Sequence, residues 1–334
     1  MMTPPDTRRS AIRLGPGAEF DLIRRLLEEA PGAIEGVAVG PGDDAAVLEV
    51  DGRVVLSSDL AMEGVHFRRQ WLTLPEIGYR AVAAAMSDLA AMAARPIGVL
   101  VSLAIPGAEA AESGPAIHDG IREACGLGGA CLLGGDLTGS PGPLVLDIMV
   151  VGSVERPITR SGARAGDELW VTGVLGGAAG AVTAWEAGGD PDPALRSAYA
   201  RPVPRIGEAR WLAEDAGVTA MIDLSDGLAG DAGHLAAASG VGIVIEESLV
   251  PTHAGLTSDL AMTLAFTGGE DYELCVSVPG GRLGPLAGDF ESRFGVRLTR
   301  VGYVADGDGV SILRPGAASP EPLHGSGFNH FTVR

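Results

Sequence analysis

Carboxylates beside small residues are the feature of this sequence best suited to chemistry. The stretch 40–59 contains two such groups: an acidic pair, Asp43 and Asp44, behind a Gly-Pro-Gly turn, and a Ser-Ser-Asp triplet that ends in Asp59 after an apolar run. Adjacent carboxylates repel each other and favour bulk water, unless a cation lies between them and Asp59. By itself this stretch is equally typical of a solvated acidic turn and of a cation site.

The same pattern recurs along the chain: an apolar strand, then a turn of small residues with one or two acids. It occurs at Asp136, at Asp223 with Asp226, and at Glu270 with Asp271. Each turn alone is weak support for a site, because aspartate also caps helices. Taken together, aspartates with few histidines and no thiolate cluster favour hard cations, Mg²⁺ before Zn²⁺. Several Mg²⁺ ions that bridge carboxylates to a nucleotide triphosphate would neutralise the charge of phosphoryl transfer. The pattern therefore predicts Mg²⁺-dependent nucleotide binding.

Asp88 lies in the middle of a helix predicted over 75–94, among apolar and alanine residues. A buried carboxylate without a partner is costly, so Asp88 needs a metal ion or an arginine beside it. The other acids of the same pattern favour the metal ion. The alanine content of this helix also predicts that its neighbours pack closely against it.

The charge balance restricts the partners of the chain. The formal net charge is −19, which argues against nucleic acid or an anionic membrane as a partner. All 24 basic residues are arginine, and lysine is absent. This excludes a Walker A phosphate loop, a kinase-type strand lysine and a Schiff-base lysine. Phosphate binding therefore falls to metal ions, arginine and backbone N–H groups.

The 334 residues are enough for two domains, each with its own core. The cysteines are three, scattered and set in apolar runs, which is typical of core residues in a reducing compartment. The first 16 residues lack the apolar core of a signal peptide, and no run is long enough to span a membrane. We expect a soluble cytoplasmic protein with no membrane partner.

The predicted elements place these acids at strand ends. In the first half, strands are expected over 98–105, 131–133 and 144–154, the last covered on both faces, with a helix over 110–127. In the second half, strands are expected from 171, over 221–223, 241–246, 274–278, 298–304 and 310–313, with helices over 205–216 and 283–294. The Gly-rich stretch 172–180 leads into a helix, where backbone N–H groups could hold an anion.

Several motifs in order resemble the thiamine-monophosphate kinase family: GDDAAVL, SSDLAMEGVHF, MSDLAAMAA, LLGGDLT, ITRSGARAGD, IDLSDGLAGDAGHLA, TGGEDYEL and GFNHF. The resemblance covers nearly the whole chain after about residue 18. It implies a two-domain α/β (α+β) fold like that of aminoimidazole-ribonucleotide synthetase, with an N-terminal sheet domain that pairs in a homodimer. The implied divisions are a mobile tail (1–17), an N-terminal Mg/ATP-binding and dimerisation domain (18–157) and a C-terminal α/β domain (158–334). The implied reaction is in-line transfer of the γ-phosphoryl group of ATP to thiamine monophosphate, with Mg²⁺ and no phosphoenzyme.

The resemblance also implies roles for individual residues. The implied Mg²⁺ ligands are Asp44, Ser57, Ser58, Asp59, Asp88, Asp136, Asp223 and Asp226. The implied ATP contacts are Gly135, Asp136, Arg160 and Ser225. The implied contacts to thiamine monophosphate are His66, Glu270 and Phe328, although a structural histidine is an equal alternative for His66. Leu137 interrupts the Asp-Thr-Thr usual in the family, so a second hydroxyl near the nucleotide is not expected.

Three other functions compete with this interpretation. Another ATP-dependent enzyme of the superfamily, such as selenophosphate synthetase, would carry a different glycine-rich N-terminal segment, with a reactive cysteine or selenocysteine in that example. A non-catalytic Mg-nucleotide-binding module would bind ATP without forming thiamine diphosphate. A metal-dependent phosphatase would release phosphate from thiamine monophosphate without ATP.

Overall fold

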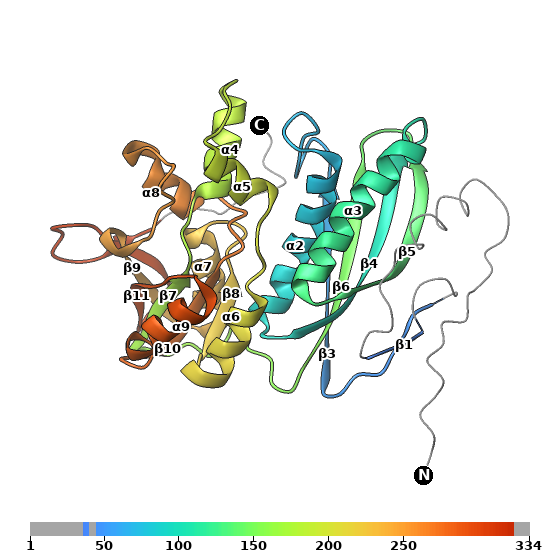
Figure 1. Ribbon diagram of the computed structural model, residues 1–334. Helices are drawn as coiled ribbons and strands as arrows, with labels where there is room; N and C mark the ends of the chain where they lie inside the picture. Colours follow the sequence, from blue (N-terminus) through green and yellow to red (C-terminus); the bar gives the residue numbers. More distant parts are fainter. Residues whose placement is uncertain (1–35, 40–44, 324–334) are drawn as a thin grey trace, which may run out of the picture. The chain divides into compact units, whose positions relative to one another are not determined.

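The computed structural model describes residues 36–39 and 45–323, which form two compact units (Figure 1). Of the described residues, unit 1 comprises those up to 89 together with 95–155, and unit 2 comprises 90–94 together with those from 156 onward. The predicted tail over 1–17 lies outside the described residues. Within the described ranges, every helix is too short or too polar to cross a membrane.

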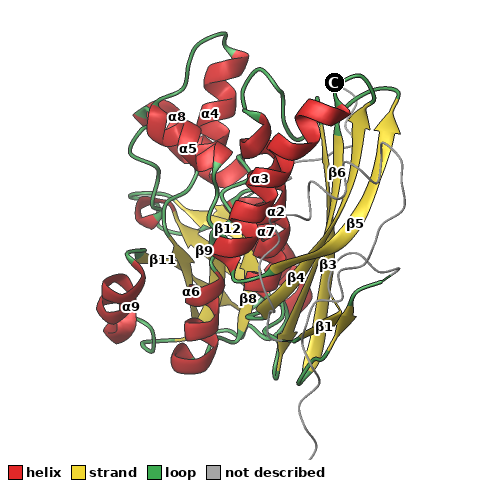
Figure 2. Cartoon of the chain, turned by 45° about the vertical axis from the view of Figure 1, so that its right-hand side comes forward, coloured by secondary structure: helices red, strands yellow, loops and turns green. Residues whose placement is uncertain are grey.

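Unit 1 holds a four-stranded sheet in the order β3-β6-β4-β5. Its strands are β3 (Arg53–Met62), β4 (Arg95–Pro106), β5 (Cys131–Ser140) and β6 (Val145–Val154). Strand β5 runs parallel to β4, to which α3 (Ala110–Gly128) connects it, and the other pairs are antiparallel. Helices α2 (Leu74–Ala91) and α3 lie together on one face of this sheet (Figure 2).

The close packing predicted for the alanine-rich helix is confirmed, and glycine is the reason. A Cβ atom at Gly78 of α2 would lie 2.1 Å from the backbone oxygen of Ile117 in α3. A Cβ atom at Gly120 of α3 would lie 1.8 Å from the backbone oxygen of Pro75 in α2. Both distances are shorter than any real contact, so the two helix backbones touch where only glycine fits.

The second face of this sheet is partly covered. Strands β1 (Val37–Val39) and β2 (Val47–Leu48) pair with each other, and Val37 and Leu48 pack on a cluster of Cys131, Leu133 and Val151. Beyond them, large apolar side chains of the same sheet are exposed: Val54 (52%), Leu56 (61%), Leu60 (49%) and Met149 (40%). Coverage of the predicted strand 144–154 on both faces therefore holds at residues 150–153 of the described chain but not at Asp147 and Met149, which are exposed.

Unit 2 holds a seven-stranded sheet in the order β13-β12-β9-β11-β7-β10-β8, in which only the β12–β9 pair is parallel. Its strands are β7 (Asp167–Thr172), β8 (Ala220–Asp223), β9 (Gly242–Glu246), β10 (Leu274–Pro279), β11 (Leu298–Ala305), β12 (Gly309–Leu313) and β13 (Glu321–Pro322). Its helices are α4 (Gly177–Glu186), α5 (Pro193–Ala200), α6 (Ile206–Trp211), α7 (Leu228–Ser239), α8 (Ser258–Thr267) and α9 (Ala287–Phe294). Helices α5 and α8 were not expected from the sequence.

Alternating side chains give this sheet two apolar faces. Leu169, Val171 and Ile222 belong to the cluster that contains α7. Trp170 and Met221, one residue out of phase, belong to the cluster that contains α6 and α9. Helices therefore cover both faces of the unit 2 sheet. The cysteines Cys125, Cys131 and Cys275 are buried and free, which confirms their prediction as core residues.

Candidate active site

Ser57, Asp59 and Asp88 lie close together in unit 1, where β3 meets α2. Alternate residues of a strand share a face, so Ser57 and Asp59 project from the more buried face of β3. The Ser57 hydroxyl donates a short hydrogen bond to Oδ2 of Asp88, 31 residues further along the chain. Three of the predicted Mg²⁺ ligands are thus brought into one place.

The charge environment of this group is unfavourable for its carboxylates. Burial, together with repulsion from Asp88 and Asp147, raises the pKa of Asp59 from 3.8 to about 6. Neither Asp59 nor Asp88 forms an ion pair with an arginine among the described residues. The arginine partner considered for Asp88 is therefore absent from this part of the chain, and a cation would relieve the repulsion.

Ser58 lies on the opposite, exposed face of β3 and has its own carboxylate partner. Its hydroxyl donates a 2.8 Å hydrogen bond to Oδ1 of Asp147 in β6. Asp147 was not predicted as a site residue. The available signal was an acid inside the otherwise apolar run 144–154, which calls for an explanation in the same way as Asp88 does.

Gly135 and Asp136 lie inside β5, not at a turn after it, so the predicted strand 131–133 is too short. The Ser-Ser-Asp triplet likewise lies inside β3 and not at its exit. Gly135 has φ 153°, and a Cβ atom there would lie 1.8 Å from the backbone oxygen of Val101. Asp136 is exposed, and its Oδ1 accepts the N–H of Leu137 at 2.9 Å. Close approach of β4 and β5 thus explains this glycine without a ligand.

His66 lies in the loop that follows β3. Its Nδ1 accepts the backbone N–H of Met62 at 3.1 Å, so the neutral imidazole carries its proton on Nε2. The same turn is closed by the N–H of His66, which donates to the Met62 carbonyl at 2.9 Å. This contact fixes the ring and its tautomer, and it supports the structural alternative without excluding a ligand contact.

In unit 2 the acids gather in the loop between β8 and α7. Asp223 is the last residue of β8 and is buried, as predicted for a strand end. Asp231, in the first turn of α7, accepts the N–H of Asp226 at 3.0 Å and also that of Ser225. Burial raises the pKa of Asp231 to about 7, with repulsion from Asp223 and Asp226. Asp231 thus fixes the backbone between two predicted Mg²⁺ ligands.

The loop that carries Glu270 packs against the loop that carries Ser225. The N–H of Glu270 donates to the Ser225 carbonyl at 2.8 Å, which brings a predicted ATP contact beside a predicted contact to the second substrate. Glycine makes this possible, because a Cβ atom at Gly269 would lie 2.1 Å from the same Ser225 oxygen. Glu270 itself has φ 72°, a left-handed conformation that is rare for a residue with a side chain.

Arg160 is exposed in the segment that precedes β7. The hydroxyl of Ser239, at the end of α7, donates to the Arg160 carbonyl at 3.0 Å and accepts the N–H groups of Gly162 and Ala163 at 3.2 Å. The backbone around Arg160 is therefore fixed on α7, while its guanidinium is exposed. Asp44 and Phe328, the other predicted site residues, lie outside the described residues.

No group of three or more His, Cys, Asp or Glu side chains in residues 36–39 and 45–323 is arranged to hold a metal ion by itself. The donors at the β3–α2 group are nevertheless hydroxyl and carboxylate oxygens, the ligands that Mg²⁺ prefers. Mg²⁺ commonly takes one or two carboxylates and completes its shell with water and phosphate oxygens. The chemistry of the donor set therefore fits this ion.

Comparison with known proteins identifies the family. Residues 42–154 match the N-terminal domain of AIR synthase related proteins, and residues 164–313 match the C-terminal domain. The thiamine-monophosphate kinase of Rhodopirellula baltica is 35% identical over 309 residues, which cover 88% of this chain and 92% of that protein. The chain belongs to the thiamine-monophosphate kinase family.

Solved thiamine-monophosphate kinases share the fold. The enzyme from Stenotrophomonas maltophilia has a TM-score of 0.78 at 34% identity, with 88% of this chain and 96% of that chain covered. The structure of AaThiL in complex with AMPPCP and TMP has a TM-score of 0.73 at 28% identity, with 93% and 96% covered. The α/β fold and the family expected from the sequence motifs are confirmed.

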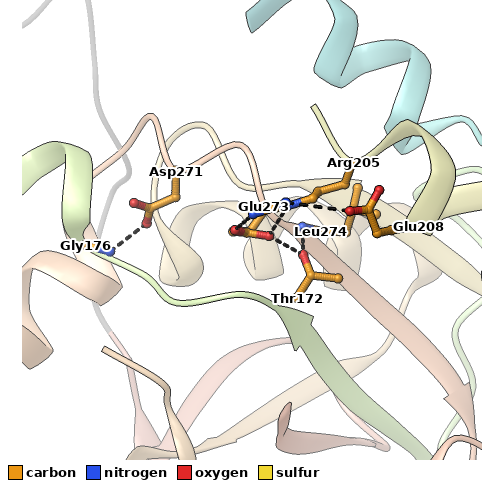
Figure 3. A network of polar contacts seen from close by, with 7 residues as sticks. All are labelled: Thr172, Gly176, Arg205, Glu208, Asp271, Glu273 and Leu274. Atoms are coloured by element: carbon orange, nitrogen blue, oxygen red, sulfur yellow. Dashed lines mark hydrogen bonds and ion pairs between the residues drawn. The ribbon is translucent and has the colours of Figure 1, made fainter. Parts of the chain in front are cut away.

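A buried network of polar side chains, which the sequence did not reveal, lies at the end of the loop that carries Glu270 (Figure 3). The Nε of Arg205 donates to Oε2 of Glu273 at 2.8 Å, and its Nη2 pairs with Oε1. The same Oε2 accepts the Thr172 hydroxyl at 2.5 Å, and that hydroxyl accepts the Leu274 N–H at 2.8 Å. The guanidinium of Arg205 is thus used by a carboxylate of the chain itself.

Proposed function

We propose that this chain catalyses the transfer of the γ-phosphoryl group of ATP to thiamine monophosphate, giving thiamine diphosphate and ADP. A phosphate oxygen of thiamine monophosphate bonds to the γ-phosphorus, and the bond from that phosphorus to the β,γ-bridging oxygen of ATP breaks. The group passes directly between the substrates, so no side chain acts as nucleophile and no phosphoenzyme forms. ADP leaves with the bridging oxygen.

The similarity to known proteins is the observation that supports this function most strongly. The chain matches thiamine-monophosphate kinases over most of its length, and a relative of known structure binds AMPPCP, an ATP analogue, together with TMP. The contact between the Ser225 and Glu270 loops is consistent with two substrates that meet, since one loop is expected to touch ATP and the other thiamine monophosphate.

Mg²⁺ is the cofactor proposed for this reaction. The residues proposed to hold it are Asp44, Ser57, Ser58, Asp59, Asp88, Asp136, Asp223 and Asp226. When bound, Mg²⁺ neutralises phosphate charge and orients the phosphoryl oxygens. The mutual repulsion of Asp59 and Asp88, without an arginine partner among the described residues, supports this role.

The side chains of this chain are proposed to bind and orient the substrates. Gly135, Asp136, Arg160 and Ser225 are proposed to contact ATP, and His66, Glu270 and Phe328 thiamine monophosphate. Since the chain has no lysine, Arg160 is the cationic side chain proposed for the phosphates.

A homodimer that pairs through unit 1 is part of the proposal. The support is the exposed apolar part of the sheet, which we call the outer face: Val54, Leu56, Leu60 and Met149. An apolar face of this kind on a sheet is unusual for a monomer and is typical of an interface. The cytoplasmic location expected from the sequence stays a prediction.

The function is tested by incubating the purified chain with ATP and thiamine monophosphate, with and without Mg²⁺, and measuring thiamine diphosphate and ADP. We expect equal amounts of both products, and none after removal of Mg²⁺ with a chelator. ATP binding without product would favour a nucleotide-binding module. Release of phosphate from thiamine monophosphate without ATP would favour a phosphatase.

A further inference from the structure

The segment Gly268–Glu273, between α8 and β10, has an unusual backbone. Glu270 and Tyr272 have φ values of 72° and 52°, in the left-handed region that residues with side chains rarely adopt. Each such residue costs on the order of 1–3 kcal/mol and persists only where its surroundings hold it. Two of them, separated by Asp271 alone, show that strong contacts fix this segment.

Two of those contacts are backbone hydrogen bonds. The N–H of Glu270 donates to Ser225 and the N–H of Tyr272 donates to Leu224, both to the carbonyl oxygen and both at 2.8 Å. They attach the segment to the loop after β8. Both anchors lie on the same neighbouring loop. At its end the segment is held by the contacts of Glu273 with Arg205 and Thr172, and the side chain of Asp271, between Glu270 and Tyr272, makes a further contact.

Asp271 provides that contact on α4. Its Oδ2 accepts the N–H of Gly176 at 2.8 Å (Figure 3). The N–H groups of Gly177 and Ala178 also point to this carboxyl group. These are first-turn N–H groups of a ten-residue helix, which have no partner within the helix. The stretch 172–180, whose N–H groups the sequence suggested for an anion, thus holds a side chain of the chain itself.

The glycines of α4 suit this arrangement. Gly176 has φ 82°, which turns its N–H toward Asp271, and a Cβ atom there would lie 3.0 Å from the backbone nitrogen of Ala265. A Cβ atom at Gly177 would lie 3.0 Å from side-chain atoms of Ala198 and His253. Burial raises the pKa of Asp271 to about 8 although these N–H groups lower it, so the group is enclosed between the two elements.

We propose that Asp271 is a positioning residue, which anchors the segment Gly268–Glu273 on the N-terminus of α4 and thereby holds Glu270 in the conformation that contacts thiamine monophosphate. This inference rests on the proposed function, because Glu270 is the substrate contact of that function. Asp271 itself touches neither substrate. Its loss is expected to weaken one substrate selectively.

The test is steady-state kinetics of Asp271→Ala with each substrate varied in turn. We expect the KM for thiamine monophosphate to rise about tenfold and the KM for ATP to stay within twofold of the parent chain. Asp271→Asn keeps one acceptor oxygen for three N–H groups, so a selective rise of about threefold is expected. This milder variant carries the test if Asp271→Ala does not fold.

Asp192→Ala is the matched control. Asp192 also accepts a backbone N–H at a helix N-terminus, that of Ala194 at 2.8 Å in α5, so its loss removes a comparable helix cap. Both KM values should then stay within twofold. Equal rises in both KM values, or no rise in either folded Asp271 variant, would overturn the positioning role. If the parent chain makes no thiamine diphosphate, the proposed function itself fails, so the two failures are distinguishable.

Discussion

The two units use carboxylates in opposite ways. In unit 1, Asp59 and Asp88 lie near each other with a serine hydroxyl as the neighbour, and no arginine pairs with them among the described residues. In unit 2, Asp231 and Asp271 accept backbone N–H groups, and Glu273 pairs with Arg205. Residue type is the same, but unit 2 satisfies these acids from within, whereas unit 1 leaves charge that an ion would balance.

The sheets differ in the same sense. Helices cover both faces of the unit 2 sheet, while the outer face of unit 1 exposes Leu56 and Met149. Carboxylates whose hydrogen bonds and ion pairs are made within the unit hold loops in place, whereas carboxylates without such partners are suited to binding a cation. The difference indicates that breaking the Arg205–Glu273 pair of unit 2 should act on stability, whereas changes at Asp59 and at the outer face of unit 1 should act on activity and on association.

The largest effect is expected from Arg205→Ala in unit 2. This change leaves Glu273 buried without its partner, and breaking a buried ion pair costs about 3–5 kcal/mol of unfolding free energy. Urea unfolding measures it. Arg210→Ala, which removes an exposed pair with Glu214 at 3.9 Å, should stay within about 1 kcal/mol. Similar losses of unfolding free energy in the two variants would contradict the expected difference between the buried Arg205–Glu273 pair and the exposed Arg210–Glu214 pair.

The next effect is expected from Asp59→Asn in unit 1, on activity instead of stability. Asp59 is proposed to hold Mg²⁺ that binds the phosphates, so its loss should lower kcat by on the order of 10²–10³-fold. The melting temperature should stay equal or rise, because the change removes repulsion with Asp88 and Asp147. Asp119→Asn, an exposed acid on α3, should keep activity within twofold. Normal turnover of Asp59→Asn would exclude Asp59 from the site.

Leu56→Glu tests the outer face. Leu56 is 61% exposed, and a charge placed there should weaken the proposed dimer by at least about tenfold, since a buried, unpaired charge is unfavourable. Light scattering after gel filtration at several concentrations measures the mass. Leu127→Glu is the control, because Leu127 is 71% exposed on α3 of the same unit. A monomeric parent chain, or equal behaviour of both variants, would contradict pairing through this face.

The last expected effect is a pH dependence in unit 2. The folded-state pKa of Asp271, about 8, is above the ordinary 3.8, so the folded state binds this proton more tightly. The stability it contributes is complete below pH 3.8 and is lost as pH rises through 8. Asparagine cannot ionise, so the melting temperature of the parent chain relative to Asp271→Asn should fall by several degrees between pH 5 and 9. A difference that grows with pH would mean that the N–H groups keep Asp271 ionised.

Most strands and helices were predictable because their periodicity is local. The helix expected over 75–94 is α2 (Leu74–Ala91), and the strand expected over 298–304 is β11 (Leu298–Ala305). Asp59 and Asp136 were assigned to turns because serine, glycine and aspartate have low strand propensity. Pairing with β6 and β4 keeps them in strands, which is a tertiary effect. Helix α5 was missed although Asp192-Pro193 is a helix-start signal.

The amino-acid sequence by itself determined the family, the absence of lysine and the acidic residue types, because motifs and composition need no coordinates. It did not distinguish the acid beside other acids, Asp59, from the acid enclosed by backbone N–H groups, Asp271. That distinction depends on which backbone and side-chain groups surround each carboxylate. Only chain folding brings Ser57 to Asp88 and Gly176 to Asp271, because these partners lie 31 and 95 residues apart in the sequence.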